Sequence, residues 1–324
     1  MNSVLTLLLH LLVAFLAVAT ALAILFPRRP VLGVPQHWGL QLWQLSLLAA
    51  IAGLLLSDWM AVAMSAAVGG YWSWRLWPRR APGDAIEEAT PLLRIVSANL
   101  LYENLDFDRT LRGLVALDAD VLVLSEVTPE MRQHLRRLAT SHPHALDTCA
   151  PENVYGILIL SRFPLTLRST GVGEDPTPRH IAAELSIGID TISLIAIHPT
   201  NPLRFSRAHR IPAEFDAVAD LCRTAPSDLV LIGDCNAAGW SSYLRALERA
   251  AGLANDGRMR PSWPIWLPPL VRLPLDHVWV RGRVALLKAG LGPRFGSDHL
   301  PLVAEIGFRD QMSEIRGQMR DRQP

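Results

Sequence analysis

The sequence Leu229-Val-Leu-Ile-Gly-Asp-Cys-Asn236 decides which fold this chain adopts. Its four consecutive aliphatic residues predict a strand buried on both faces, which is typical of a sheet covered by other layers. The strand ends at a glycine, and the oxygen-bearing side chains of Asp234 and Asn236 follow it directly. Because strand ends hold side chains rigidly at the edge of a sheet, this stretch predicts both a layered α/β domain and a polar site.

Four other short apolar runs lie beside polar side chains of the same chemical kinds. These side chains are Asn99 after 94–98, Glu126 after 121–125, His198 after 194–197, and the pair Asp298-His299 ahead of 302–306. One such residue alone usually caps a helix or lies on a rim without function. Five strand ends of this type together supply the carboxylates, amides and imidazoles that bind hard cations and transfer protons.

The hydrophobic spacing between these strands predicts helices. Strands are expected at 92–100, 119–124, 156–160, 181–185, 191–197, 229–232, 275–280 and 302–306, and helices at 107–117, 131–139, 213–222 and 240–251. Apolar strands that alternate with amphipathic helices indicate an α/β domain whose helices cover the faces of the sheet.

The polar motifs occur in the order found in one known superfamily. They are Asn99, Glu126, Gly233-Asp-Cys-Asn236, Asp276 in Leu275-Asp-His-Val278, and Ser297-Asp-His-Leu-Pro301. From Leu92 to Ile306 the chain resembles the endonuclease/exonuclease/phosphatase superfamily. The resemblance implies a four-layered α-β-β-α sandwich of two mixed sheets, with an active site at one edge. It also implies hydrolysis of a phosphoester by in-line attack of water on phosphorus.

The resemblance also implies a role for each motif residue. Glu126, Asn99 and Asp298 look like the site for Mg²⁺ or Mn²⁺, a small hard ion that oxygen ligands suit. Asp276 resembles the carboxylate that orients His299. Asp234 and Asn236 resemble the pair that positions the attacking water and the phosphate, and His198 the donor to a non-bridging oxygen. Either Asp234 or His299 could act as the general base.

Three residues near these motifs have alternative interpretations. Arg179 is expected to hold the substrate phosphate, and its neighbour His180 could also contact the substrate; a solvated loop is the alternative for both. Cys235 departs from the family pattern, which usually has an aromatic residue there. A nucleophilic cysteine is the alternative to a side chain that points into the core, but no basic neighbour in the sequence activates this thiol.

The first 77 residues have a different composition. From Val4 to Phe26 there are 23 residues without a charged side chain, more than the roughly 20 that span a bilayer as a helix. Ser57-Asp58 divides a second apolar region, so we expect membrane helices at about 4–26, 40–56 and 59–77. A linker at 78–91, a catalytic domain at 92–308 and a polar tail at 309–324 would follow. The alternative for the first segment is a signal peptide cleaved near Ala21-Leu-Ala23.

Two observations on orientation conflict. With three spans, the arginines that follow helices one and three lie on the same side of the membrane, which predicts a cytoplasmic domain; they are Arg28, Arg29, Arg75, Arg79 and Arg80. The loop Pro261–Leu270, with its Ser-Trp-Pro sequence, resembles the membrane-anchored bacterial branch of the superfamily, whose domain lies outside the cytoplasm. Because the charge argument rests on only these five arginines, we expect a multi-pass protein of the inner (plasma) membrane with an extracytoplasmic domain.

Charge and hydropathy favour a substrate in the membrane. Residues 83–308 carry 22 Lys or Arg against 26 Asp or Glu, a formal charge of −4, whereas proteins that bind bulk nucleic acid usually present a basic surface. Trp263 and Trp266 lie among prolines and aliphatic residues, as an interfacial loop does; packing in the core is the other interpretation. The sequence therefore predicts a membrane-anchored hydrolase of lipid or membrane-proximal phosphoesters, with the bilayer as its partner. A membrane-tethered nuclease and an inactive scaffold are the alternatives.

Overall fold

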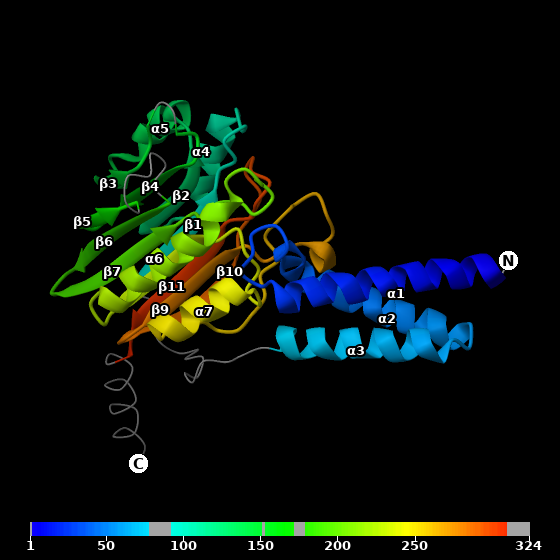
Figure 1. Cartoon of the computed structure of the whole chain (residues 1–324). Coiled ribbons are helices and arrows are strands. Elements are labelled where there is room, and N and C mark those ends of the chain that lie inside the picture. Colours follow the sequence, from blue (N-terminus) through cyan, green and yellow to red (C-terminus); the bar gives the residue numbers. More distant parts are fainter. Residues whose placement is uncertain (1, 78–91, 151–152, 172–178, 310–324) are drawn as a thin grey trace, which may run out of the picture.

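The computed structural model describes residues 2–77, 92–150, 153–171 and 179–309. The expected linker at 78–91 and residues 310–324 of the expected tail lie outside the described residues. The described chain consists of a layered α/β sandwich and an N-terminal bundle of three helices (Figure 1).

Two sheets form the centre of the sandwich. The larger sheet has the order β10 (Val284–Leu291), β11 (Leu302–Phe308), β1 (Leu93–Asn99), β2 (Val121–Val127), β4 (Gly156–Ser161) and β3 (His144–Asp147). The smaller has the order β5 (Leu165–Thr170), β6 (His180–Ile187), β7 (Asp190–Ile197), β8 (Leu229–Asp234) and β9 (Asp276–Arg281). The pairs β1–β2 and β7–β8 are parallel and the other pairs antiparallel, so both sheets are mixed, as predicted.

Helices cover the outer face of each sheet and complete the layers. Aliphatic side chains from the facing sides of both sheets, among them Ile95, Val123 and Ile232, form the central core. On the larger sheet, α4 (Phe107–Ala116) and α5 (Pro129–Leu135) bury one apolar face each. On the smaller sheet, α6 (Ile211–Thr224) and α7 (Ser242–Ala251) do the same. The expected sandwich of two mixed sheets is confirmed.

The secondary structure differs from the sequence expectations at a few places. Strands β3, β5 and β10 were not predicted. The helix expected at 240–251 begins at Ser242, because the hydroxyl of Ser241 accepts a hydrogen bond from the Leu244 N–H and caps the helix. The helix expected at 131–139 becomes α5 followed by a short 3-10 helix at Arg136–Leu138.

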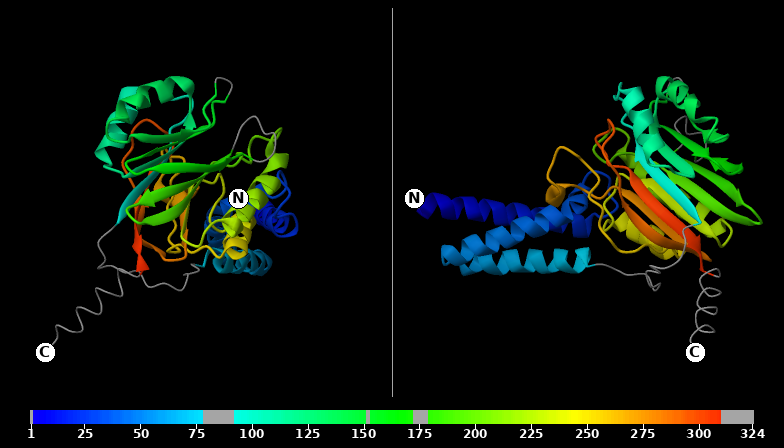
Figure 2. Two further views of the ribbon diagram at one scale, coloured as in Figure 1. Left: turned by 90° about the vertical axis from the view of Figure 1, so that its left-hand side faces the viewer. Right: turned by 180° about the vertical axis from the view of Figure 1, so that it is seen from behind.

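The N-terminal bundle contains α1 (Asn2–Leu25), the 3-10 helix η1 (Val34–Trp38), α2 (Gly39–Leu55) and α3 (Trp59–Leu76). Two segments, Ser3–Leu25 and Val34–Leu55, are long and apolar enough to cross a membrane. The third helix has the length of a span but includes serines, glycines and Arg75, which lower its hydropathy. Three spans therefore remain a prediction. Figures 1 and 2 show the three helices projecting together from one side of the sandwich.

The bundle is docked on the sandwich through the loop between β8 and α7. Ala238 and Trp240 of this loop join the apolar core of the bundle, which includes Leu16 and Trp72. The Arg75 guanidinium donates to the Trp240 carbonyl oxygen over 2.6 Å, and Arg28 forms a 2.6 Å ion pair with Asp216 of α6. The helices are thus packed against the domain that holds the candidate site.

Candidate active site

The strand ends named from the sequence meet at one edge of the sandwich. The Asn99 amide, at the end of β1, donates to Glu126 of β2 over 3.1 Å and to Asp234 of β8 over 3.0 Å. His198, directly after β7, has Nε2 at 3.6 Å from a Glu126 carboxylate oxygen and 3.7 Å from an Asp234 oxygen. Residues that lie up to 135 positions apart in sequence therefore share one buried site.

The backbone is specialised at these strand ends. Glu126 and Asn236 have φ angles of 58° and 48°, in the left-handed region that side chains rarely adopt. At Gly233, a Cβ atom would collide with the carbonyl oxygen of Ile197 in the adjacent strand β7. Such conformations cost about 1–3 kcal/mol each and persist where the surrounding fold imposes them, often at functional sites.

Asp276 and His299 form a buried pair. His299 Nδ1 lies 2.9 Å from an Asp276 oxygen, while Nε2 lies 3.7 Å from Asp234. Burial alone would lower the pKa of His299, but the carboxylates of Asp276 and Asp234 outweigh burial and raise this pKa well above its usual value. Burial raises the pKa of Asp234, and the charge of His299 opposes that shift. The imidazole is consequently a cation at neutral pH.

His198 has the opposite electrostatic character. It is 2% exposed, and burial, with the charges of Arg179 and His299, lowers its pKa to about 3. The ring is therefore neutral. Among the described residues, its Nε2 has no hydrogen-bond partner, although that atom is buried. A buried polar atom without a partner is unfavourable unless a ligand or water completes it, so Nε2 is suited to contact a substrate oxygen.

A second group of pocket residues supplies positive charge. The Arg179 guanidinium lies over the Tyr155 ring at 5.1 Å, and Arg204 lies over the same ring at 4.7 Å. Arg204 also donates to the Tyr102 hydroxyl over 3.3 Å. The sequence analysis named Arg179 but missed Arg204, Tyr102 and Tyr155, because they come from loops and follow no apolar run. His180 is 2% exposed and does not line the pocket.

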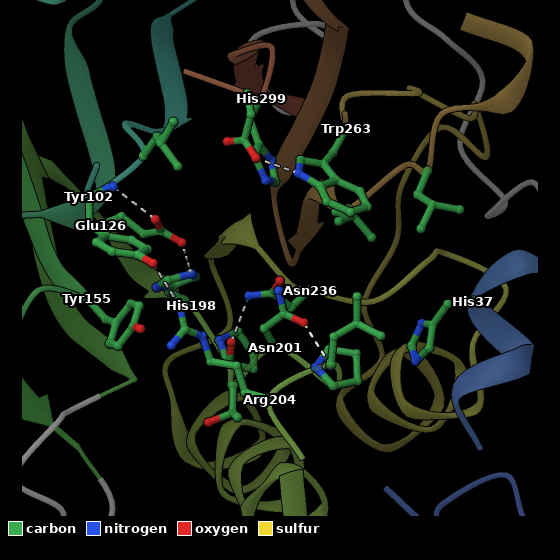
Figure 3. Close-up of a pocket in the computed structure, with 18 of the residues that line it drawn as sticks. His37, Tyr102, Glu126, Tyr155, His198, Asn201, Arg204, Asn236, Trp263 and His299 are labelled. Atoms are coloured by element: carbon green, nitrogen blue, oxygen red, sulfur yellow. Dashed lines mark hydrogen bonds and ion pairs between the residues drawn. The ribbon is translucent and has the colours of Figure 1, made fainter. Parts of the chain in front are cut away.

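Trp263 connects the loop before β9 to the site. Its indole Nε1 donates to Asp298 over 2.7 Å, and its ring lies 6.2 Å from the His299 ring (Figure 3). Asp298 lines the same pocket as Glu126. Trp266, in contrast, is 66% exposed. The two tryptophans that the sequence left undecided therefore face different surroundings.

Two sets of side chains are suited to a cation. In the first set, Glu126 and Asp234 place carboxylate oxygens around the same Asn99 amide group and the same His198 nitrogen. A hard cation would offset the repulsion between these two carboxylates. The second set, Asp234, Asp276 and His299, has ligand atoms within 4.8 Å of one another, but a protonated His299 ring has no free nitrogen lone pair to bind a metal ion, so the first set suits a cation better. Asn99 Oδ1 accepts a hydrogen bond from the Leu101 N–H over 2.9 Å, so this side chain orients Glu126 through its NH₂ group.

Cys235 lies in the core beneath α6 and α7 and is fully buried. Burial, together with the nearby Asp234 and Asp276 charges, raises the pKa of its thiol far above the usual range. Because the thiolate is the reactive form, this environment makes Cys235 a core residue rather than a nucleophile.

These residues surround one pocket that extends across the site. Figure 3 shows Glu126, Tyr102, Tyr155 and His198 on one side, Asn236 near the middle, and His37 on the opposite side. The empty space of this pocket, with its open mouth included, is about 870 Å³.

Comparisons with known proteins agree with this geometry. The sequence model of the endonuclease/exonuclease/phosphatase family matches residues 96–299. No curated protein matches the sequence. Among solved structures, TDP2 of D. rerio in complex with single-strand DNA product superposes with a TM-score of 0.55 at 17% identity, covering 66% of this chain and 98% of that one.

Two bacterial structures show the same fold. The 3′ phosphatase NExo of Neisseria, bound to a product DNA hairpin, superposes with a TM-score of 0.53 at 20% identity and covers 67% of this chain and 100% of its own. An endonuclease/exonuclease/phosphatase of Beutenbergia cavernae gives a TM-score of 0.52 at 17% identity, covering 67% of this chain and 71% of that chain. At these identities the likeness establishes the fold alone.

Proposed function

The chain belongs to the endonuclease/exonuclease/phosphatase family and is a metal-dependent phosphoester hydrolase; we propose that its substrate is a phosphoester carried by the lipid bilayer. One observation carries this proposal. The segment 262–273 places Trp263 in the site, while its carbonyl oxygens at Leu270 and Val271 accept hydrogen bonds from Gln44 and Gln41 of α2. A single loop thus joins the reaction centre to the apolar helices.

The same loop exposes apolar side chains beside the helix bundle. Trp266 and Leu270 are 66% and 74% exposed, and Leu267 and Val271 are also exposed. An exposed apolar patch next to helices suited to a membrane gains free energy by entering the interface, at roughly 25 cal/mol per Å² of apolar area buried. With this loop at the interface, the phosphate-binding end of the pocket lies just above the headgroups.

The residues of the site would divide the work as follows. Glu126, with Asp234 beside it and Asp298 in the same pocket, would hold the Mg²⁺ or Mn²⁺, and Asn99 would orient Glu126. When bound, this ion polarises a phosphoryl oxygen and stabilises the leaving oxygen. Arg179 and Arg204 bind the phosphate through charge-assisted hydrogen bonds.

Proton transfer falls to the buried carboxylate and the two imidazoles. Asp234 takes a proton from the attacking water, and Asn236 helps to position this water. The water oxygen bonds to phosphorus as the ester P–O bond breaks, and solvent protonates the departing oxygen. Neutral His198 donates from Nε2 to a non-bridging oxygen, while cationic His299 stabilises the charge that develops there.

We also propose that α3 is a third membrane span and that the domain lies outside the cytoplasm, as in the membrane-anchored bacterial branch. The contrary argument relies on arginines that follow the helices. Two of them have structural roles, because Arg28 pairs with Asp216 and Arg75 binds the Trp240 carbonyl oxygen; Arg79 and Arg80 lie outside the described residues. Arginines that dock the domain give little information on topology.

A membrane-tethered nuclease is the second candidate, because two of the similar structures contain product DNA. The acidic balance of the domain opposes it, since nucleic-acid affinity depends on basic residues that neutralise phosphates. An inactive scaffold is disfavoured because the carboxylates, amides and imidazoles of the site are all present and converge.

The test is hydrolysis by the full chain in detergent with Mg²⁺. The substrates would be phosphatidic acid, phosphatidylglycerol, polyprenyl phosphates and a supercoiled plasmid. We expect turnover of at least one lipid, loss of this activity with EDTA, and a decrease of about 100-fold or more in Glu126→Gln and His299→Ala. His209→Ala, which changes an exposed histidine outside the pocket, is the matched control. Nicking of the plasmid alone would establish the nuclease, and inactivity on every substrate would favour the scaffold.

A further inference from the structure

One wall of the pocket comes from the membrane anchor rather than from the catalytic domain. Two residues of η1, His37 (Figure 3) and Trp38, line the same cavity as Glu126, His198 and His299. The family match begins at residue 96, so η1 lies outside the part of the chain that resembles the family. The anchor therefore adds to the pocket two side chains that the catalytic domain does not supply.

This wall is held rigidly. Gln36, 2% exposed, accepts the Ser242 N–H at its side-chain oxygen and the Trp240 indole N–H at its carbonyl oxygen, each over 2.7 Å. His37 Nδ1 accepts the Ala238 N–H over 3.3 Å. Three hydrogen bonds to consecutive parts of one loop fix η1 against the domain, as expected for a binding surface arranged before the substrate arrives.

The wall is apolar on the side away from the phosphate-binding groups. Trp38 is half-buried and lines the pocket together with Leu273 and Leu275, both of which are largely buried. The exposed residues 266–271 lie on the same loop as Leu273. Apolar side chains therefore line both the pocket, at Trp38, Leu273 and Leu275, and the lip at 266–271 that contacts α2, with Arg272 between them in sequence. An apolar group can be desolvated against these side chains without losing hydrogen bonds.

We infer that η1 is the subsite for the apolar chain of the substrate, and that Trp38 is its specificity-determining residue. The phosphate lies between Glu126, His198 and His299, and the chain esterified to it passes Trp38 and Leu273 toward the bilayer. The His37 ring, whose Nδ1 accepts the Ala238 N–H, forms the wall of the pocket on the side opposite Glu126 and His198. This inference rests on the proposed function and narrows the substrate class to phosphoesters with an aliphatic chain.

A matched pair of chromogenic substrates tests this subsite. Methyl 4-nitrophenyl phosphate and dodecyl 4-nitrophenyl phosphate share the scissile bond and differ only in the aliphatic chain. The full chain in detergent with Mg²⁺ should prefer the dodecyl ester. In Trp38→Ala, the ratio of kcat/KM for dodecyl over methyl ester should decrease about tenfold, mostly through KM, because the substitution removes apolar contact with the chain. Trp38→Phe should retain most of the ratio, and Trp59→Ala, at the far end of α3, should leave it unchanged.

The possible failures are distinguishable. If the wild type hydrolyses lipids and prefers the dodecyl ester but Trp38→Ala retains the full preference, the η1 subsite is wrong while the proposed function stands. An equal decrease for both esters would also overturn it, because it would assign Trp38 a structural role only. If the wild type hydrolyses neither lipids nor the dodecyl ester while it nicks plasmid, the proposed function itself fails. Leu273→Ala, at the other pocket residue that the chain is proposed to pass, provides the same ratio if Trp38→Ala does not fold.

Discussion

At the scale of single residues, the site contains two imidazoles with opposite charge states. His299 is held as a cation by two carboxylates, whereas His198 is buried beside positive charges and stays neutral. The difference comes from Asp276, whose oxygen lies 2.9 Å from His299 Nδ1, within hydrogen-bond distance, whereas the Glu126 and Asp234 oxygens lie 3.6 and 3.7 Å from His198 Nε2. One ring can therefore stabilise negative charge while the other acts as a neutral hydrogen-bond donor.

Replacing Asp276 tests this division. Asp276 raises the pKa of His299, so Asp276→Asn should make the ring lose its proton at a lower pH. We expect kcat to fall about 100-fold and the alkaline limb of the pH–rate profile to move toward lower pH. The measurement is kcat against pH for lipid hydrolysis, with Asp220→Asn, an exposed carboxylate of α6 outside the pocket, as the control. An alkaline limb at the wild-type position would contradict a cationic His299 that depends on Asp276.

The buried His180 should make the free energy of unfolding depend on pH. Burial lowers its pKa from 6.5 to about 4, so the unfolded chain binds a proton near pH 6.5 and the folded chain does not. Stability is therefore lost as pH falls from 6.5 toward 4. At pH 5 the loss due to this residue is about 2 kcal/mol, or roughly 4–8 °C in Tm for a domain of this size.

The variant His180→Gln removes that titration. Its Tm should decrease less between pH 7 and pH 5 than the wild-type Tm does. His134→Gln, which changes an exposed histidine, should keep the wild-type dependence. Equal pH dependence in His180→Gln and the wild type would show that the buried ring takes up a proton without loss of stability.

The residues that sequence reasoning could find are those next to apolar runs. Asn99, Glu126, Asp234 and His198 directly follow or end a buried strand, and a local pattern is enough to name them. Arg204 and Tyr155 come from loops, and His37 comes from the anchor; nothing local distinguishes them from surface residues. Only the tertiary fold brings their side chains to the pocket, so no spacing rule applied along the chain could have selected them.

At the scale of secondary-structure elements, the strands that were missed are all at sheet edges. β3 and β10 are the two outer strands of the larger sheet, and β5 is an outer strand of the smaller one. A central strand is buried on both faces and appears as a continuous aliphatic run, as in β8. An edge strand such as β5 (LTLRST) exposes most of its side chains and so resembles a loop in sequence.

The 3-10 helix η1 is the element that couples the N-terminal bundle to the site, and Gln36 makes its main contact with the domain. Gln36→Ala removes two hydrogen bonds, one to the Ser242 N–H and one from the side-chain amide to the Pro27 carbonyl oxygen. Because the groups left behind are mostly buried, we expect a loss of about 2–3 kcal/mol. In calorimetry of the full chain in detergent, the sandwich of the variant should unfold at a lower temperature than that of the wild type. Its unfolding should also be less strongly coupled to the unfolding of the bundle.

A weaker contact provides the comparison for that prediction. Gln44→Ala removes one exposed hydrogen bond to the Leu270 carbonyl oxygen and should cost less than about 1 kcal/mol. If both variants unfold like the wild type, η1 does not couple the two parts of the molecule.

At the scale of the whole molecule, the bundle and the sandwich form one packed unit. An apolar helix has the same sequence pattern whether it only tethers a domain or packs against it, so the hydropathy of residues 4–26 could predict the anchor but not the docking. The docking depends on particular polar contacts, such as Arg28 with Asp216 and Arg75 with the Trp240 carbonyl oxygen. These contacts fix the direction in which the pocket faces.

A pocket fixed in this way should reach lipids only in the membrane that holds the protein. The pocket wall at η1 and the apolar lip at 266–271 both lie at the end of the bundle that meets the domain, so a lipid substrate, under the proposed function, would enter from the surrounding bilayer. The test uses reconstituted vesicles and a dodecyl phosphoester placed either in the vesicles that contain the protein or in separate, protein-free vesicles. We expect hydrolysis to be at least tenfold slower when the ester is in the protein-free vesicles. Transfer of the chain between vesicles is slow because moving it through water costs about 0.8 kcal/mol per CH₂. The water-soluble methyl ester should be hydrolysed at the same rate in both arrangements. It is the control for protein whose domain faces the lumen, because equal rates on this ester show that both samples have the same amount of accessible protein. Equal rates on lipids in both vesicle populations would mean that the pocket opens to bulk water and that the docking does not direct it toward the membrane.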